Sequence, residues 1–94
     1  GRLAGIIVSG PDRAEAENYA RALARMAQAP AHVVVLGPAE APLAMIRGRY
    51  RFRLLVRTAR TVDLQAYLRD WLERAPKHPA KLRVAVDVDP YSFM

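Results

Sequence analysis

Arg47-Gly48-Arg49-Tyr50-Arg51-Phe52-Arg53 opens the strongest candidate for a β-strand in this chain. From Arg49 to Arg57 the side chains alternate in character. Because successive side chains of a strand leave opposite faces, the pattern predicts one apolar face and one face carrying guanidinium groups roughly 6.5 to 7 Å apart. The cationic face consists of Arg49, Arg51, Arg53 and Arg57, and the apolar face of Tyr50, Phe52, Leu54 and Val56.

A row of arginines is costly to bury without anions nearby, so we expect this face to meet either water or an anionic partner. A spacing of this size is comparable with the repeat of a phosphate backbone. Two interpretations therefore stay open: an interface for nucleic acid or another anion, and a solvated outer face that keeps the sheet soluble.

The composition limits the class of protein. A chain of 94 residues allows one domain with a two-layer core. It holds no cysteine, which excludes disulfides and thiolate sites and fits a cytosolic setting. We expect no signal peptide and no membrane span, because no apolar run is long enough. The net charge is +6, and thirteen of the fifteen basic residues are arginine, which binds phosphate in a bidentate manner.

The periodicity predicts six elements. Asp12 and Glu15 have the spacing of a capping box, which predicts a helix from residue 12 to about 28, and Thr61 is expected to cap a second helix reaching about residue 75. The expected strands are residues 3–8, 32–36, 49–58 and 81–89. Residues 37–48 are expected to be irregular, since Pro38 and Pro42 interrupt them, so the strands they join are not expected to form a tight hairpin.

The resulting order, β-α-β-β-α-β, predicts an α+β fold of the ferredoxin-like, split β-α-β type. Two helices are expected to cover one face of a four-stranded antiparallel sheet. The first and third strands are expected in the centre, which places the arginines in mid-sheet on the open face. Arg83, on the neighbouring edge strand, adds to them.

Sites for other chemistry are weakly supported. Asp87 and Asp89 share a face of the last strand, but they lack further ligands for a metal, so we expect ion pairs with the arginines instead. The histidines and serines have no catalytic partners at a recognisable spacing, and no glycine pattern suits a phosphate loop. The expected site residues therefore include none for catalysis and none for a metal.

The positions of Tyr50 and Phe52 indicate whether a nucleic acid would be bound through its bases or through its backbone. Many sheet-based RNA-binding proteins stack bases on aromatic side chains of the open face. Here the alternation places both aromatics on the face opposite the arginines, beneath the expected helices. This argues for contact with the backbone rather than stacking on bases.

Several segments together resemble the C-terminal domain of the bacterial primosomal replication-restart helicase family, PriA. They are Gly1-Arg2-Leu3-Ala4, Leu36-Gly37-Pro38-Ala39-Glu40-Ala41-Pro42-Leu43, Gly48-Arg49-Tyr50-Arg51 and Asp87-Val88-Asp89-Pro90. The resemblance extends over nearly the whole chain. Two departures are Glu40, where a proline is expected, and the ending Tyr91-Ser92-Phe93-Met94.

The resemblance implies a domain like ribosomal protein S10 within a larger ATP-dependent 3′→5′ DNA helicase, whose ATP and zinc sites lie upstream. It implies binding to branched or single-stranded DNA at stalled forks, docking on the helicase core of the same chain, and contact with single-stranded DNA-binding protein. By positional matching, that contact falls at Arg60, Thr61 and Gln65. No enzyme activity and no cofactor are expected in this segment. We expect a monomer in the bacterial cytoplasm, associated with the nucleoid and without membrane contact.

Three hypotheses follow. In the first, a DNA-binding accessory domain holds the backbone through Arg47, Arg49, Arg51, Arg53, Arg57 and Arg83. In the second, the basic face docks the helicase core or an acidic tail and has no direct DNA role. The third is a ferredoxin-like sensor of a small ligand, which usually needs glycine-rich loops that this chain lacks.

Overall fold

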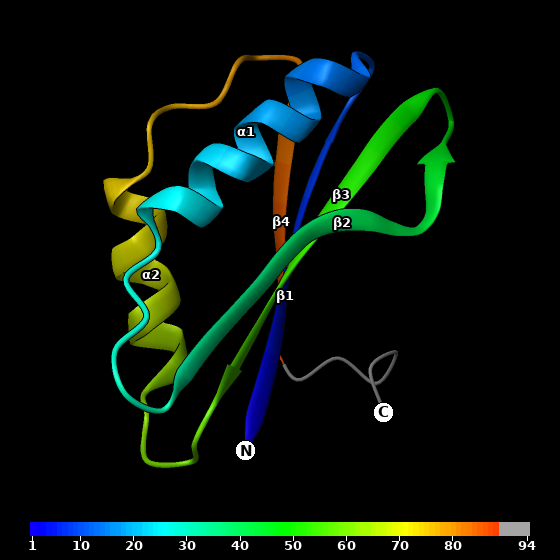
Figure 1. Ribbon diagram of the computed structural model, residues 1–94. Helices are drawn as coiled ribbons and strands as arrows, with labels where there is room; N and C mark the ends of the chain where they lie inside the picture. Colours follow the sequence, from blue (N-terminus) through cyan, green and yellow to red (C-terminus); the bar gives the residue numbers. More distant parts are fainter. Residues whose placement is uncertain (89–94) are drawn as a thin grey trace.

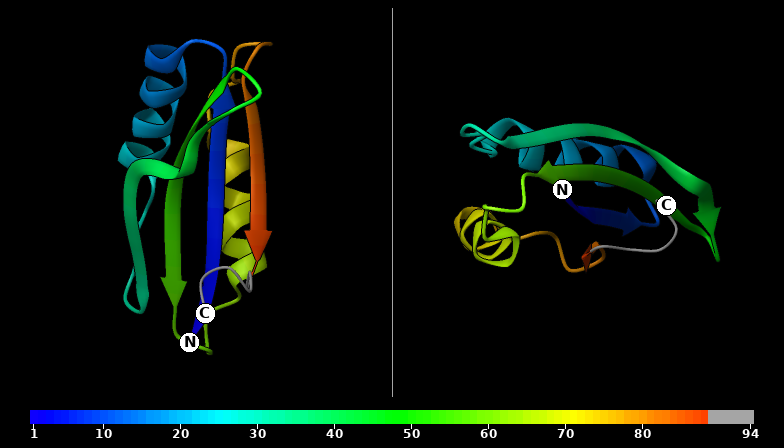
Figure 2. Two further views of the ribbon diagram at one scale, coloured as in Figure 1. Left: turned by 90° about the vertical axis from the view of Figure 1, so that its right-hand side faces the viewer. Right: turned by 90° about the horizontal axis from the view of Figure 1, so that it is seen from below.

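The computed structural model of the chain describes residues 1–88, apart from the side chains of residues 42–44. Its elements in order are β1 (Arg2–Gly10), α1 (Arg13–Met26), β2 (Val33–Ile46), β3 (Arg49–Thr58), α2 (Leu64–Arg74) and β4 (Arg83–Val88) (Figure 1). The four strands form one antiparallel sheet in the order β2-β3-β1-β4. Both helices lie behind the same face of this sheet in the left view of Figure 2. This arrangement is compatible with the predicted ferredoxin-like fold, with the first and third strands in the centre.

The central strand β3 has the predicted bounds and the predicted faces. Phe52, Leu54 and Val56 are buried against the helices, where they meet the fully buried side chains of β1. The arginines of β3 alternate with them and are half-buried or exposed on the opposite face. The alternation of the sequence therefore translates directly into the two faces of the sheet.

The two helices begin at aspartates. Asp12 accepts a hydrogen bond from the backbone N–H of Glu15 at 3.1 Å, as the capping prediction requires. The prediction that Thr61 caps the second helix is wrong. Asp63 caps it, with its carboxylate 3.0 Å from the N–H of Ala66. Both residue types cap helices, but the negative charge of Asp63 also meets the positive end of the helix dipole.

Aromatic side chains of α2 satisfy the carbonyl end of α1. The indole Nε1 of the fully buried Trp71 donates to the carbonyl oxygen of Leu23 at 3.1 Å. The Tyr67 hydroxyl donates to the carbonyl of Gln28, just beyond the helix. Burial raises the pKa of Tyr67, against a smaller lowering effect of the Arg74 charge. The last four carbonyls of a helix lack hydrogen-bond donors within the helix. The two side chains supply donors at this end of α1, and the same bonds hold α2 against α1.

The segment from residue 37 to 48 departs from the prediction. β2 continues through it to Ile46, and a two-residue turn at Arg47 and Gly48, with φ of 53° and 75°, leads directly into β3. Positive φ at both turn positions is the geometry of the tight hairpin that the sequence argued against. The pairing with β3 shifts register between Leu36 and Ala39 and again between Glu40 and Met45. Each shift contains one of the two prolines, which lack the N–H that a regular ladder needs.

No helix in the described part of the chain, residues 1–88, has the length and apolar character needed to cross a membrane.

We expect Trp71→Phe to lower the free energy of unfolding by about 1–3 kcal/mol, because it leaves the Leu23 carbonyl buried without its donor and shrinks a core side chain. Urea unfolding followed by circular dichroism measures the change. Tyr67→Phe is the matched control, since its acceptor residue Gln28 is exposed and water replaces the lost donor. Equal losses for the two variants would contradict this account of the helix contact.

Candidate nucleic-acid interface

The predicted arginines lie on the open face of the sheet, and four of them gather at one end. Arg47, Arg49, Arg51 and Arg83 line a cavity of about 240 Å³ together with Ser9 and Ile46. These residues come from the β2–β3 turn and from β1, β2, β3 and β4. The fold thus concentrates cations that are up to 36 positions apart in the sequence.

The strand register explains how the four side chains meet. Ser9 of β1 lies opposite Arg51 of β3 on one side and opposite Arg83 of β4 on the other. Neighbouring strands are roughly 4.8 Å apart, so these two arginines flank the small serine at a backbone separation of about 10 Å. The hairpin turn adds Arg47 at the rim. A long apolar residue at position 9 would fill the space that the arginines surround.

The guanidinium of Arg49 is bound to the backbone of two neighbouring segments. Its Nη2 donates to the carbonyl of Ser9 at 2.8 Å and to the carbonyl of Lys81 at 2.9 Å. The same side chain has a buried Nε donor without a partner. Arg49 therefore ties β3 to β1 and to the segment that precedes β4, and it retains an unsatisfied donor beside the cavity.

Arg53 and Arg57 lie farther along β3, outside the cavity. Arg53 is opposite Ile7, and Arg57 is opposite Leu3 on β1 and Val34 on β2. Leu36 and Val34 are 49% and 39% exposed on this face. The open face is thus cationic at one end and substantially apolar at the other, which the sequence analysis missed. The signal available in the sequence was the continuous apolar run from Val33 to Leu36, since alternate residues of a strand must face away from the helices.

The ion pair predicted for Asp87 is absent from the described part of the chain. Among residues 1–88, Asp87 forms no ion pair, because it lies across Gly5 from the uncharged Leu55. Asp89, the second aspartate of the predicted pair, lies outside the described residues. Within the same part of the chain, no three histidine, aspartate or glutamate side chains gather as metal ligands.

The aromatic side chains of β3 face the helices, as predicted. Phe52 is 4% exposed, and the guanidinium of Arg13 lies 5.7 Å from the centre of its ring. The same guanidinium forms an ion pair with Glu40 of β2. Glu40, the residue that departs from the expected proline, therefore has a structural role on the helix side. Base stacking on Phe52 from the open face is excluded by its position.

The predicted partner residues Arg60, Thr61 and Gln65 lie apart from the cavity. Arg60 and Thr61 belong to the turn after β3, and Gln65 is the second residue of α2. All three are exposed. About nine residues of β3, or roughly 30 Å of strand, separate them from the cavity. Any contact they make is independent of the arginine cluster.

Arg49→Lys is expected to lower the free energy of unfolding by about 1–2 kcal/mol, because an ammonium on a differently shaped stem does not reproduce the planar bridge to two carbonyls. Arg57→Lys, the same change on the same strand at an exposed position, is expected to change it by less than about 0.5 kcal/mol. Urea unfolding of both variants measures the difference. If both variants match the parent, Arg49 has no structural role.

The sequence of this chain is similar to those of known proteins. Residues 1–91 match the family described as the primosomal protein N C-terminal domain. The chain is 36% identical over 92 residues to the replication restart protein PriA of Rickettsia felis, covering 98% of the chain but 14% of that relative. It is 29% identical over 96 residues to PriA of Bacillus subtilis, covering 98% of the chain and 12% of the relative. A probable PriA of Deinococcus radiodurans is 40% identical over 98 residues, covering 97% of the chain and 10% of the relative.

The chain is thus similar to a small part of much longer proteins, and the similarity covers nearly all of its own length. It belongs to the family of C-terminal domains of the replication restart protein PriA.

Proposed function

We propose that this chain is a DNA-binding accessory domain that holds the phosphate backbone of branched DNA during replication restart. The observation that carries the proposal is the gathering of Arg47, Arg49, Arg51 and Arg83 around one cavity on the open face. Arginine binds phosphate oxygens through paired N–H groups, and clustered guanidinium groups repel one another unless anions lie between them. A phosphate in the cavity also supplies an acceptor close to Arg49.

The mode of binding we propose is independent of base sequence. Arg51 and Arg53 repeat along β3 at roughly 6.5 to 7 Å, a spacing comparable with that of successive phosphates. Phe52 between them is buried on the helix side, so no aromatic platform for bases accompanies this row. Phosphate contacts fix position and affinity without reading sequence, which suits recognition of fork shape.

The wider setting is proposed from the relatives, which are named replication restart proteins and are far longer than this chain. In this proposal the domain is part of an ATP-dependent helicase of the bacterial cytoplasm, with the ATP and zinc sites in the remainder of the protein. Its fold is the variant found in ribosomal protein S10. Single-stranded DNA-binding protein contacts Arg60, Thr61 and Gln65 at the N-terminal end of α2, far from the arginine cluster.

A second candidate function rests on the apolar end of the open face. Val34 and Leu36 are exposed beside Leu55, and such a patch beside a cationic cluster also suits docking on another protein surface. In this alternative the open face packs on the helicase core, and DNA contact is incidental. The two functions differ in their expected response to substitution of the cavity arginines. Only the DNA-binding function predicts that removing these arginines lowers the affinity for DNA.

Removing two cavity arginines tests the choice. For Arg51→Ala with Arg83→Ala, we expect weaker binding of labelled fork DNA and a log affinity versus log salt slope reduced by about 1.4–1.8, since each phosphate contact contributes roughly 0.7–0.9. Fluorescence anisotropy at several salt concentrations measures both quantities. The control is Arg25→Ala with Arg69→Ala, which removes the same charge from the exposed faces of the helices.

We expect the control to keep the salt slope of the parent. Equal slopes for the cavity variant, the control and the parent would refute DNA binding at this cavity. Unchanged DNA binding combined with lost binding to the separately produced helicase core would favour the docking function instead.

A further inference from the structure

The helix layer leaves part of β4 uncovered. On the side that faces the helices, Ala4, Ile6 and Val8 of β1 are fully buried, but Val86 of the neighbouring β4 is 41% exposed and Val84 only half-buried. β4 is also an edge of the sheet, so alternate N–H and C=O groups of its backbone point away from β1. Within residues 1–88, an apolar surface and a strand edge without a neighbouring strand therefore occur side by side.

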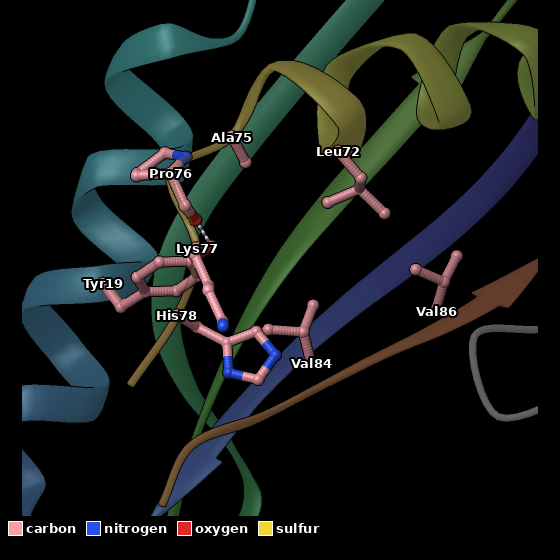
Figure 3. A pocket seen from close by; sticks show the side chains of 8 residues that line it. All are labelled: Tyr19, Leu72, Ala75, Pro76, Lys77, His78, Val84 and Val86. Carbon is pink, nitrogen blue, oxygen red and sulfur yellow. Dashed lines mark hydrogen bonds between the residues drawn. The ribbon is translucent and has the colours of Figure 1, made fainter. Parts of the chain in front are cut away.

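A groove of about 280 Å³ lies beside this edge, as Figure 3 shows. β4 forms one wall through Val84 and Val86. The opposite wall consists of Leu72 near the end of α2 and of the segment that follows this helix. The groove is separate from the arginine cavity, with which it shares no lining residue.

Contacts to α1 hold the outer wall of the groove in place. The hydroxyl of Tyr19 donates to the carbonyl of Pro76, drawn as the dashed line in Figure 3. The ring of His78 meets the ring of Tyr19 edge to face, with the centroids 5.9 Å apart. Burial raises the pKa of Tyr19, so its hydroxyl remains a donor at neutral pH. The groove is thus built before any ligand arrives, which lowers the entropic cost of binding.

The polar groups of the groove favour an anion. Lys77 lines it, and its side chain extends toward the imidazole of His78 and toward β4 in Figure 3. Among residues 1–88, no carboxylate lines the groove. Apolar walls with one ammonium group suit a ligand that carries an apolar side chain and a carboxylate.

We propose that the groove binds an extended acidic peptide of a partner protein, which adds to the sheet as a further strand beside β4. Alternate residues of an added strand point to the same face, so an apolar residue lies against Val84 and Val86 while an acidic residue two positions away reaches Lys77. Main-chain bonds to the free edge supply affinity that is independent of the peptide sequence.

This site differs from the partner contact proposed at Arg60, Thr61 and Gln65. Those residues lie at the first turn of α2 or before it, whereas the groove lies at the end of α2, which at eleven residues is about 16 Å long. It also does not depend on DNA binding, because the arginine cavity lies on the other face of the sheet.

The test uses the 94-residue chain and a fluorescein-labelled heptapeptide with phenylalanine at its centre, aspartate two positions to either side and threonine between. We expect this peptide to bind and the version with lysine in place of aspartate not to bind. Lys77→Glu is expected to weaken binding about fivefold, because repulsion replaces attraction at an exposed side chain that lines the groove. Lys81→Glu, the same change at the other lysine of the chain, is expected to alter affinity less than about twofold, since Lys81 does not line the groove.

Backbone amide NMR locates the peptide. We expect its largest shifts along β4 and at Lys77 and His78, and Val86→Glu is expected to abolish them. The proposal is overturned by absent binding, by shifts confined to Arg47, Arg51 and Arg83, or by equal affinities of the two lysine variants. Amide shifts of β4 that depend on protein concentration without peptide would show that a second copy takes the edge, which also overturns it.

Discussion

Burial of Phe52, Leu54 and Val56 beneath the two helices is the constraint on which the remaining structure depends. Side chains alternate along a strand, so a slip of β3 by one residue would bury its arginines and expose this apolar row. The core thus fixes the register of β3 against β1 and β2. In doing so it assigns every arginine of the strand to the open face, without any contact on that face being needed.

The strands next to β3 make one end of the open face cationic and the other end largely apolar. Ser9 of β1 is small enough to leave a cavity between Arg51 and Arg83, and the hairpin turn brings Arg47 to the same end. At the other end, Leu3 and Val34 flank Arg57, so the cation there is isolated among apolar groups. A backbone phosphate therefore finds several donors at one end and few at the other, which gives the proposed DNA contact a definite position on the sheet.

The periodicity of the sequence predicted those features of the fold that depend on the alternation of neighbouring residues. The bounds of β3, the side on which its arginines lie and the cap at Asp12 follow from spacing alone. The cap of α2 did not, because Thr61 and Asp63 both suit the role and helix length does not choose between them. β2 was predicted too short, since prolines ordinarily end strands, but two register shifts accommodate them while pairing with β3 resumes. The cavity, the backbone bonds of Arg49 and the groove beside β4 depend on cross-strand register and helix placement, which periodicity does not encode.

The most direct test of the central claim is NMR detection of the arginine Nε–Hε groups while the chain is titrated with fork DNA. The account predicts that the signals of Arg47, Arg49, Arg51 and Arg83 shift together at low salt and return toward their starting positions as salt is added. Shifts confined to arginines of the helix-covered side, such as Arg21, Arg25 and Arg69, with the cavity signals unmoved, would contradict it.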